Sequence, residues 1–176
     1  SEQNNRNNPP IRAGRVIGTH NGTIYNADDL FRRFHLKRGA EVDSELLFRL
    51  ADMAVGDGGL DVGAFLRLVT PCRGQIAAVL AAVGAPGHVV VLKGNKPLEF
   101  RYSRRYRAVA YSTDAGPLDD AIAACCPAPH DWRAMVVRPM TMLVFRHEDV
   151  FSPEAYHLRF DARARERITV EKGIAP

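Results

Sequence analysis

The sequence predicts a single domain of mixed α/β class, because helical and strand-like patterns both recur along a chain of domain size. Its 176 residues, 46% hydrophobic and 25% charged, are ordinary for a globular protein with one core. Residues 44–54 repeat apolar side chains at helical spacing. Residues 75–112 contain several short β-rich runs that are separated by glycine and arginine turns, which indicates antiparallel strands.

The first part of the chain predicts a loop and then a strand reversal. Residues 1–14 are rich in Asn and Pro, which favour turns and extended chain. Residues 15–20 are strand-like, and residues 23–25 continue as β. Asn21-Gly22 lies between them and is the strongest short hairpin signal, so we predict a tight reversal there.

Three helices are predicted next. Asn26 can cap the first, whose apolar stripe holds Leu30, Phe31 and Phe34 and which Gly39 ends. The second begins at Asp43 or Ser44, and the third covers residues 61–68 before Pro71.

The second half of the chain predicts strands in an antiparallel meander, with one further helix. The expected strands are residues 75–83, 89–92, 99–102, 108–112, 133–137 and 140–146, and the helix runs from about Pro117 to Ala124. The pattern fades from residue 151 onward.

Composition limits the classes of partner and cofactor. The net charge of +4 is spread over the chain, so nucleic acid is an unlikely partner on this basis. No apolar run approaches the roughly 20 residues that cross a bilayer, and we expect no membrane partner. Six scattered histidines and the lack of a phosphate-binding loop predict no metal and no cofactor.

The three cysteines, at positions 72, 125 and 126, form neither a disulfide framework nor a paired metal motif. This usage fits a reducing, cytoplasmic setting. Buried structural cysteine is the commoner case, and we assign these thiols no role.

The segment from Thr19 to Asn26, followed by Asp43, holds the candidate chemistry. The side-chain amide of Asn21 and the backbone N–H of Gly22 could both donate to a developing oxyanion. Asp43 adds a carboxylate that could receive an ammonium group. Each has a simpler interpretation as well, since Asn-Gly alone is commonly a turn and Asp before a helix is commonly a cap.

The order of these motifs resembles the glutaminase domain of class II glutamine amidotransferases. The resemblance starts with His20-Asn21-Gly22, an apolar pair and Asn26, and then Asp-Ser-Glu-Leu-Leu at residues 43–47. It continues through Arg73-Gly74, Lys96-Pro97-Leu98 and residues 110–114, and it covers roughly residues 4–124.

The resemblance implies the αββα sandwich of N-terminal-nucleophile hydrolases, in a domain over residues 1–150 with a C-terminal extension over 151–176. It implies that Asn21 and Gly22 form the oxyanion hole and that Asp43 holds the α-amino group of glutamine. His20 would lie by the substrate in a mainly structural role. The implied reaction hydrolyses glutamine to glutamate and ammonia, for an acceptor on a synthase domain or subunit.

The resemblance also implies a nucleophile outside this chain. In the family an N-terminal cysteine attacks the amide, on a strand that precedes His-Asn-Gly together with a His-Thr-Arg segment; here only twenty residues precede Asn21. We expect the missing strands and the cysteine on an upstream segment or another chain, and this chain alone to be inactive. The alternatives are a non-catalytic glutamine-binding or regulatory domain, or an interaction module whose basic tail around Arg163, Arg165 and Arg167 docks a partner.

Overall fold

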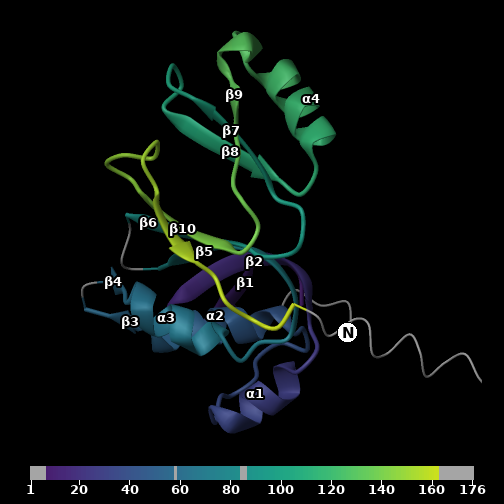
Figure 1. The fold of residues 1–176 in the computed structure, drawn as a ribbon, viewed down its shortest axis with the longest axis vertical. Helices are drawn as coiled ribbons and strands as arrows, with labels where there is room; N and C mark the ends of the chain where they lie inside the picture. Colours follow the sequence, from purple (N-terminus) through teal and green to yellow (C-terminus); the bar gives the residue numbers. More distant parts are fainter. Residues whose placement is uncertain (1–6, 58, 84–86, 163–176) are drawn as a thin grey trace, which may run out of the picture.

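The protein is built in four layers, helix, sheet, sheet and helix (Figure 1). The computed structural model describes residues 7–57, 59–83 and 87–162. The basic tail around Arg163, Arg165 and Arg167 lies outside these residues. All strand pairs in the two layered sheets are antiparallel.

A six-stranded sheet, here called the main sheet, lies at the centre of the molecule, with strand order β1-β2-β5-β6-β10-β11. Its strands are β1 (Ile11–Ala13), β2 (Val16–Ile24), β5 (Gly74–Ala82), β6 (His88–Lys93), β10 (Thr141–Arg146) and β11 (Glu154–His157). One face is covered by the helices α2 (Ser44–Met53) and α3 (Val62–Val69), and α1 (Ala27–Arg33) lies beyond α2, farther from the sheet. The short strands β3 (Val55–Gly56) and β4 (Gly59–Leu60) pair with each other between α2 and α3.

A smaller sheet lies over the other face of the main sheet. It has the order β8-β7-β9, from β7 (Glu99–Ser103), β8 (Ala108–Ser112) and β9 (Arg133–Met135). The helix α4 (Ala115–Cys125) and a 3₁₀ turn (Pro129–Asp131) form the outermost layer (Figure 1). The chain leaves the main sheet after β6, builds this upper layer and returns in β10, which pairs with β6.

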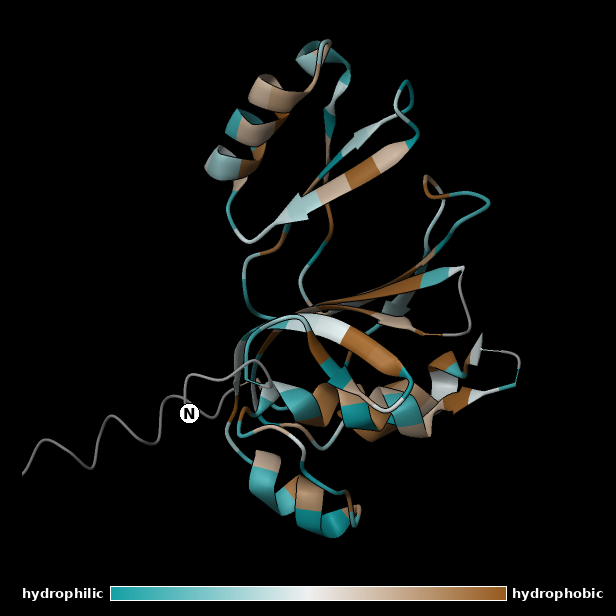
Figure 2. Ribbon diagram, turned by 180° about the vertical axis from the view of Figure 1, so that it is seen from behind, coloured by the Kyte–Doolittle hydropathy of each residue, from teal (hydrophilic) through white to brown (hydrophobic). Residues whose placement is uncertain are grey.

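The larger of two cores lies between the main sheet and the helices. Leu46, Leu47 and Leu50 of α2 are completely buried there, as their helical spacing predicts. In Figure 2 the helices next to the main sheet alternate between hydrophobic and hydrophilic segments, as amphipathic helices do. Burial of this kind contributes about 25 cal/mol per Å² of apolar surface, which makes this layer the main source of stability.

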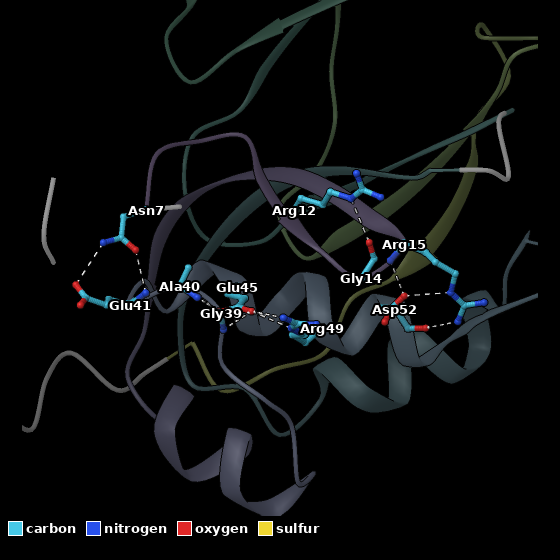
Figure 3. A network of polar contacts seen from close by, with 10 residues as sticks. All are labelled: Asn7, Arg12, Gly14, Arg15, Gly39, Ala40, Glu41, Glu45, Arg49 and Asp52. Atoms are coloured by element: carbon cyan, nitrogen blue, oxygen red, sulfur yellow. Dashed lines mark hydrogen bonds and ion pairs between the residues drawn. The ribbon is translucent and has the colours of Figure 1, made fainter. Parts of the chain in front are cut away.

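Polar contacts hold both ends of α2 (Figure 3). The carboxylate of Glu45, 1% exposed, accepts the N–H groups of Gly39 and Ala40 and pairs with Arg49. At the other end, Asp52 accepts the backbone N–H of Arg15 at 2.9 Å. These bonds fix α2 against the loop before it and against the turn that leads into β2.

The smaller core joins the two sheets. It is formed by the apolar side chains of Ala77, Val79, Val91, Leu98, Phe100, Leu143 and Phe145. Because alternate residues of a strand point to opposite faces, β5 serves both cores, with Ile76 in the larger one and Ala77 in the smaller.

The hairpin predicted at Asn21-Gly22 is wrong. β2 runs unbroken through both residues and pairs with β5 over nine positions, from Val16 with Ala82 to Ile24 with Gly74. The predicted meander is also divided, because β7 and β8 lie in the small sheet. The other predicted helices and strands are present with altered ends, while β1, β3, β4 and β11 were not predicted.

Candidate functional site

The carboxylate of Asp43 joins the end of β2 to the beginning of α2. Asp43 immediately precedes the helix, but its side chain makes no capping hydrogen bond. Its Oδ2 atom instead accepts the backbone N–H of Ile24, at 2.6 Å. The Asp43 side chain, half-buried, therefore lies at the outer edge of β2, on the side away from β5.

His20 bridges three elements behind this junction. Its Nδ1 lies 2.9 Å from Oγ of Ser44, and its Nε2 lies 3.1 Å from the backbone carbonyl of Gln75. A carbonyl can only accept, so Nε2 carries the proton and Nδ1 of the neutral ring accepts from the Ser44 hydroxyl. Burial lowers the pKa of His20, against the opposing effects of the Gln75 carbonyl and of Asp43. His20 is therefore held as a neutral bridge between β2, α2 and β5.

Gly22 occupies a position that accepts only glycine. Its φ is +147°, and a Cβ atom at this position would lie 2.0 Å from the backbone oxygen of Gln75. Any side chain would therefore push β2 away from β5.

The backbone N–H of Gly22 belongs to the outer edge of β2. Ile76, which stands opposite Gly22 in the register, donates its N–H to Asn95 and accepts from Gly94, both on the side of β6. Opposite residues in an antiparallel pair either exchange both hydrogen bonds or neither, so Gly22 is not bonded to Ile76. This leaves Gly22 on the edge where Asp43 lies.

Asn21 points to the other face of β2. Successive side chains of a strand alternate, and with His20 on the helix side Asn21 faces the small sheet. Its side chain is exposed, and within the described ranges it has no hydrogen-bonding partner. The structure thus brings Gly22 and Asp43 to one edge, with the amide of Asn21 on the adjoining face and His20 behind them.

Two asparagines support this region: Asn95, which was not singled out from the sequence, and Asn26, which was predicted to cap a helix. Asn95 donates to the carbonyl of Gly74 and accepts from Ile76, which clamps the start of β5. Asn26 donates to Pro71 and accepts from Arg73, and it makes no capping bond. Turn-forming Asn residues are visible in a sequence, but partners that lie 19 to 47 positions away are not.

Cys125 and Cys126 lie in the outermost layer, whereas Cys72 is part of the larger core, just before β5. Cys72 is buried, and burial raises the pKa of its thiol to about 12, so it stays protonated at neutral pH. Cys125 is the last residue of α4 and Cys126 follows it. Across residues 7–57, 59–83 and 87–162, no three His, Cys, Asp or Glu side chains gather into a group that could hold a metal ion.

None of the helices in the described part of the chain is long and apolar enough to cross a membrane.

Replacement of Gly22 by alanine should destabilise the protein by at least about 2 kcal/mol, because the new methyl group collides with backbone rather than with a movable side chain. Gly56→Ala is the matched control, since no atom lies within 4 Å of the methyl group it would add. Urea unfolding of both variants measures the difference. Equal stability of the two variants would contradict this account of Gly22.

The lowered pKa of His20 predicts a pH-dependent contribution to stability. The unfolded chain binds a proton near pH 6.5, whereas the folded chain does so only at lower pH. The free energy of unfolding that His20 contributes is therefore complete above about pH 6.5 and falls as the pH drops through its lowered folded-state pKa. The stability difference between the wild type and His20→Gln should shrink over this window, as measured by urea unfolding at several pH values. A difference that stays constant or grows would refute it.

Known proteins share part of this sequence and the layered architecture described above. No protein-family profile matches the chain. Two curated relatives match: a 7-cyano-7-deazaguanine synthase of Saccharolobus solfataricus, 30% identical over 115 residues, and one of Sulfolobus acidocaldarius, 27% identical over 116 residues. These alignments cover 62% and 63% of this chain but only 24% of each relative. The chain spans about a quarter of their length.

Solved structures share the fold at lower identity. Glutamine phosphoribosylpyrophosphate amidotransferase from B. subtilis matches with a TM-score of 0.64 and 16% identity, over 89% of this chain and 33% of that protein. A structure described as the allosteric regulatory enzyme of purine biosynthesis matches at 0.61 and 14%, over 87% and 32%. A glutamine aminotransferase class-II domain protein from Silicibacter pomeroyi matches at 0.53 and 19%, over 85% of this chain and 70% of that one.

These matches confirm the predicted mixed α/β class and its layered arrangement. The chain has the fold of the class II glutamine amidotransferase domains, and it is distantly homologous to 7-cyano-7-deazaguanine synthase.

Proposed function

We propose that this chain is the glutamine-binding part of a class II glutamine amidotransferase, which hydrolyses glutamine and passes the ammonia to an acceptor. The observation that carries the proposal is the edge of β2, which the carboxylate of Asp43 shares with the N–H of Gly22, while the exposed side chain of Asn21 lies on the adjoining face. A carboxylate can bind the α-ammonium group of glutamine, and two N–H donors can stabilise the oxyanion that develops on its carboxamide. The shared fold supports the same reading.

In the proposed mechanism, each group has one task. Asp43 binds the α-ammonium group of glutamine through the oxygen that does not accept from Ile24. The Asn21 amide and the Gly22 N–H, on adjacent residues of one strand, donate to the oxygen of the carboxamide as it gains negative charge. His20 keeps β2, α2 and β5 in register and does not contact the reacting atoms.

The nucleophile, in this proposal, comes from outside these 176 residues. Cys72 cannot supply it, because a buried thiol with a pKa of about 12 is not ionised at neutral pH. Cys125 and Cys126 are at the end of α4, in the outermost layer. An upstream segment or another chain that carries a cysteine would complete the site above Asn21.

The acceptor of the ammonia is proposed to lie on a synthase domain or subunit that handles a 7-deazaguanine. Both curated relatives are named for making 7-cyano-7-deazaguanine, and this chain corresponds to about a quarter of each. A cyano group contains a nitrogen atom that some donor must provide. Ammonia released from glutamine is a chemically suitable donor.

The alternative is a non-catalytic glutamine-binding or regulatory domain. The three cysteines favour it, because Cys72 is buried in the larger core and Cys125 and Cys126 lie at the end of α4, so the described chain offers no accessible thiol beside the binding groups. Ammonia release separates the two functions.

Asn21→Ala should lower the kcat for ammonia release by the full-length gene product about 100- to 1000-fold, the usual effect of removing one oxyanion donor. Thr23→Ala is the matched control, because Thr23 is exposed and lies on the same face of β2, two residues away. Ammonia release from glutamine by the wild type would support the amidotransferase. A wild type that binds glutamine and releases no ammonia would support the regulatory alternative, and equal activity of both variants would remove Asn21 from the mechanism.

Asp43→Asn should raise the KM for glutamine about 10- to 100-fold with a smaller change in kcat, because a charged partner of the ammonium group is lost. The amide oxygen of the new side chain can still accept from Ile24, so the fold should be retained. Steady-state kinetics with glutamine measure the change. An unchanged KM in a folded variant would show that Asp43 does not bind the substrate.

A further inference from the structure

On the face of the main sheet that is turned toward the small sheet, one row of aligned residues runs from Asn21 to Thr141. The register of four neighbouring strands aligns Asn21 with Ala77, Ala77 with Lys93 and Lys93 with Thr141. Side chains that are aligned in this way point to the same face of a sheet. Lys93 and the candidate oxyanion donor Asn21 therefore share one row.

The next row along the strands is apolar over the same three inner strands. Val79 pairs with Val91 and Val91 with Leu143, and all three are buried in the smaller core. Lys93 thus lies where the apolar core between the sheets ends and the polar end of the face begins.

Lys93 is a buried cation. It is 8% exposed, and its Nζ donates to the backbone carbonyl of Leu98 at 2.9 Å. It forms no ion pair with any residue that the structure describes. The nearest charged residues that follow it in the sequence are Lys96 and Glu99, and the titratable residue that extends its row is His157, which is aligned with Thr141. A buried ammonium group is costly without an anionic partner, and one neutral carbonyl satisfies only one of its three donors.

We propose that Lys93 provides the positive charge that stabilises the anion formed when glutamine is hydrolysed at Asn21. The inference rests on the proposed function. Two strand spacings separate the Cα atoms of Lys93 and Asn21, which is about 10 Å, and only the methyl group of Ala77 lies between them in the row. At that separation near a protein surface, two unit charges interact by an amount that corresponds to roughly a tenfold change in rate.

The charge acts on two species in the reaction. The carboxamide oxygen gains negative charge as the tetrahedral intermediate forms, and a nearby cation stabilises it. A cation also lowers the pKa of an attacking thiol and of an amine that acts as its base, which keeps both in their reactive forms at lower pH. Lys93 forms no covalent bond in this proposal, so it acts through its field alone.

The competing role for Lys93 is structural. Leu98 lies in the connection between β6 and β7, and the bond from Lys93 could simply hold this connection in place. A structural role needs a hydrogen-bond donor, whereas an electrostatic role needs a charge. Substitutions can separate the two.

The experiment measures ammonia release by the full-length gene product as a function of pH, with four variants. Lys93→Gln keeps a donor without the charge, Lys93→Met keeps the apolar stem, and Lys93→Arg keeps the charge. Lys37→Gln, at an exposed position away from both sheets, is the control for the loss of one positive charge. Circular dichroism establishes which variants are folded.

The expected result is a kcat/KM about tenfold lower in both neutral variants, with the acidic limb of the pH profile moved about one unit higher. Lys93→Arg should restore most of the rate and the original limb, and Lys37→Gln should match the wild type. An acidic limb that does not move in a folded neutral variant would overturn the inference and leave the proposed function intact. Failure of both neutral variants to fold would also overturn it, in favour of the structural role. A wild type that releases no ammonia would instead overturn the proposed function, and this inference with it.

Discussion

The hydrogen bond from the Ile24 N–H to the Asp43 carboxylate is the contact on which the candidate site depends. A bond of this kind, between a charged acceptor and a backbone donor, contributes about 1.5–3 kcal/mol to stability. It fixes where α2 begins relative to β2, and the contact between His20 and Ser44 holds the same crossing from behind. The buried leucines of α2 then have only one position on the main sheet in which they can pack.

β2 is used on both faces and along its edge. His20 points to the helices, Asn21 to the small sheet, and Gly22 leaves its N–H on the edge beside Asp43. Consecutive residues thus face three directions on a strand that pairs with β5 along its whole length. Side chains on such a strand are held more firmly than side chains on a loop, which suits a site that must place donors around one oxygen atom.

The sequence predicted the elements with clear periodicity and failed where distant pairing decides the structure. The spacing of Leu46, Leu47 and Leu50 predicted α2 correctly, because burial of one helical face is a local pattern. The Asn21-Gly22 hairpin was wrong because β5 pairs through both residues, and the positive φ that suits Gly22 to a turn also suits a distorted strand. Asn26 was expected to cap a helix, and a cap was the simpler interpretation of Asp43, but both side chains bind distant backbone instead. Asn21, Gly22 and Asp43 were candidates from the sequence alone, but the row that aligns Lys93 with Asn21 depends on a register that no local pattern encodes.

The small sheet and α4 are formed by one segment of chain that leaves the main sheet and re-enters it at the neighbouring strand. The chain leaves at the end of β6 and returns at the start of β10, its neighbour, and the Gly94 carbonyl accepts the Met140 N–H where the two crossings meet. The small sheet and α4 are therefore joined to the main sheet by two chain connections, one after β6 and one before β10. No other strand of the main sheet continues directly into them. Such an attachment lets residues 95–139 vary in length or sequence while β6 and β10 remain paired below. The sequences of the small sheet and α4 can thus change faster in evolution than that of the main sheet, because the strand pairing of the main sheet is complete without them.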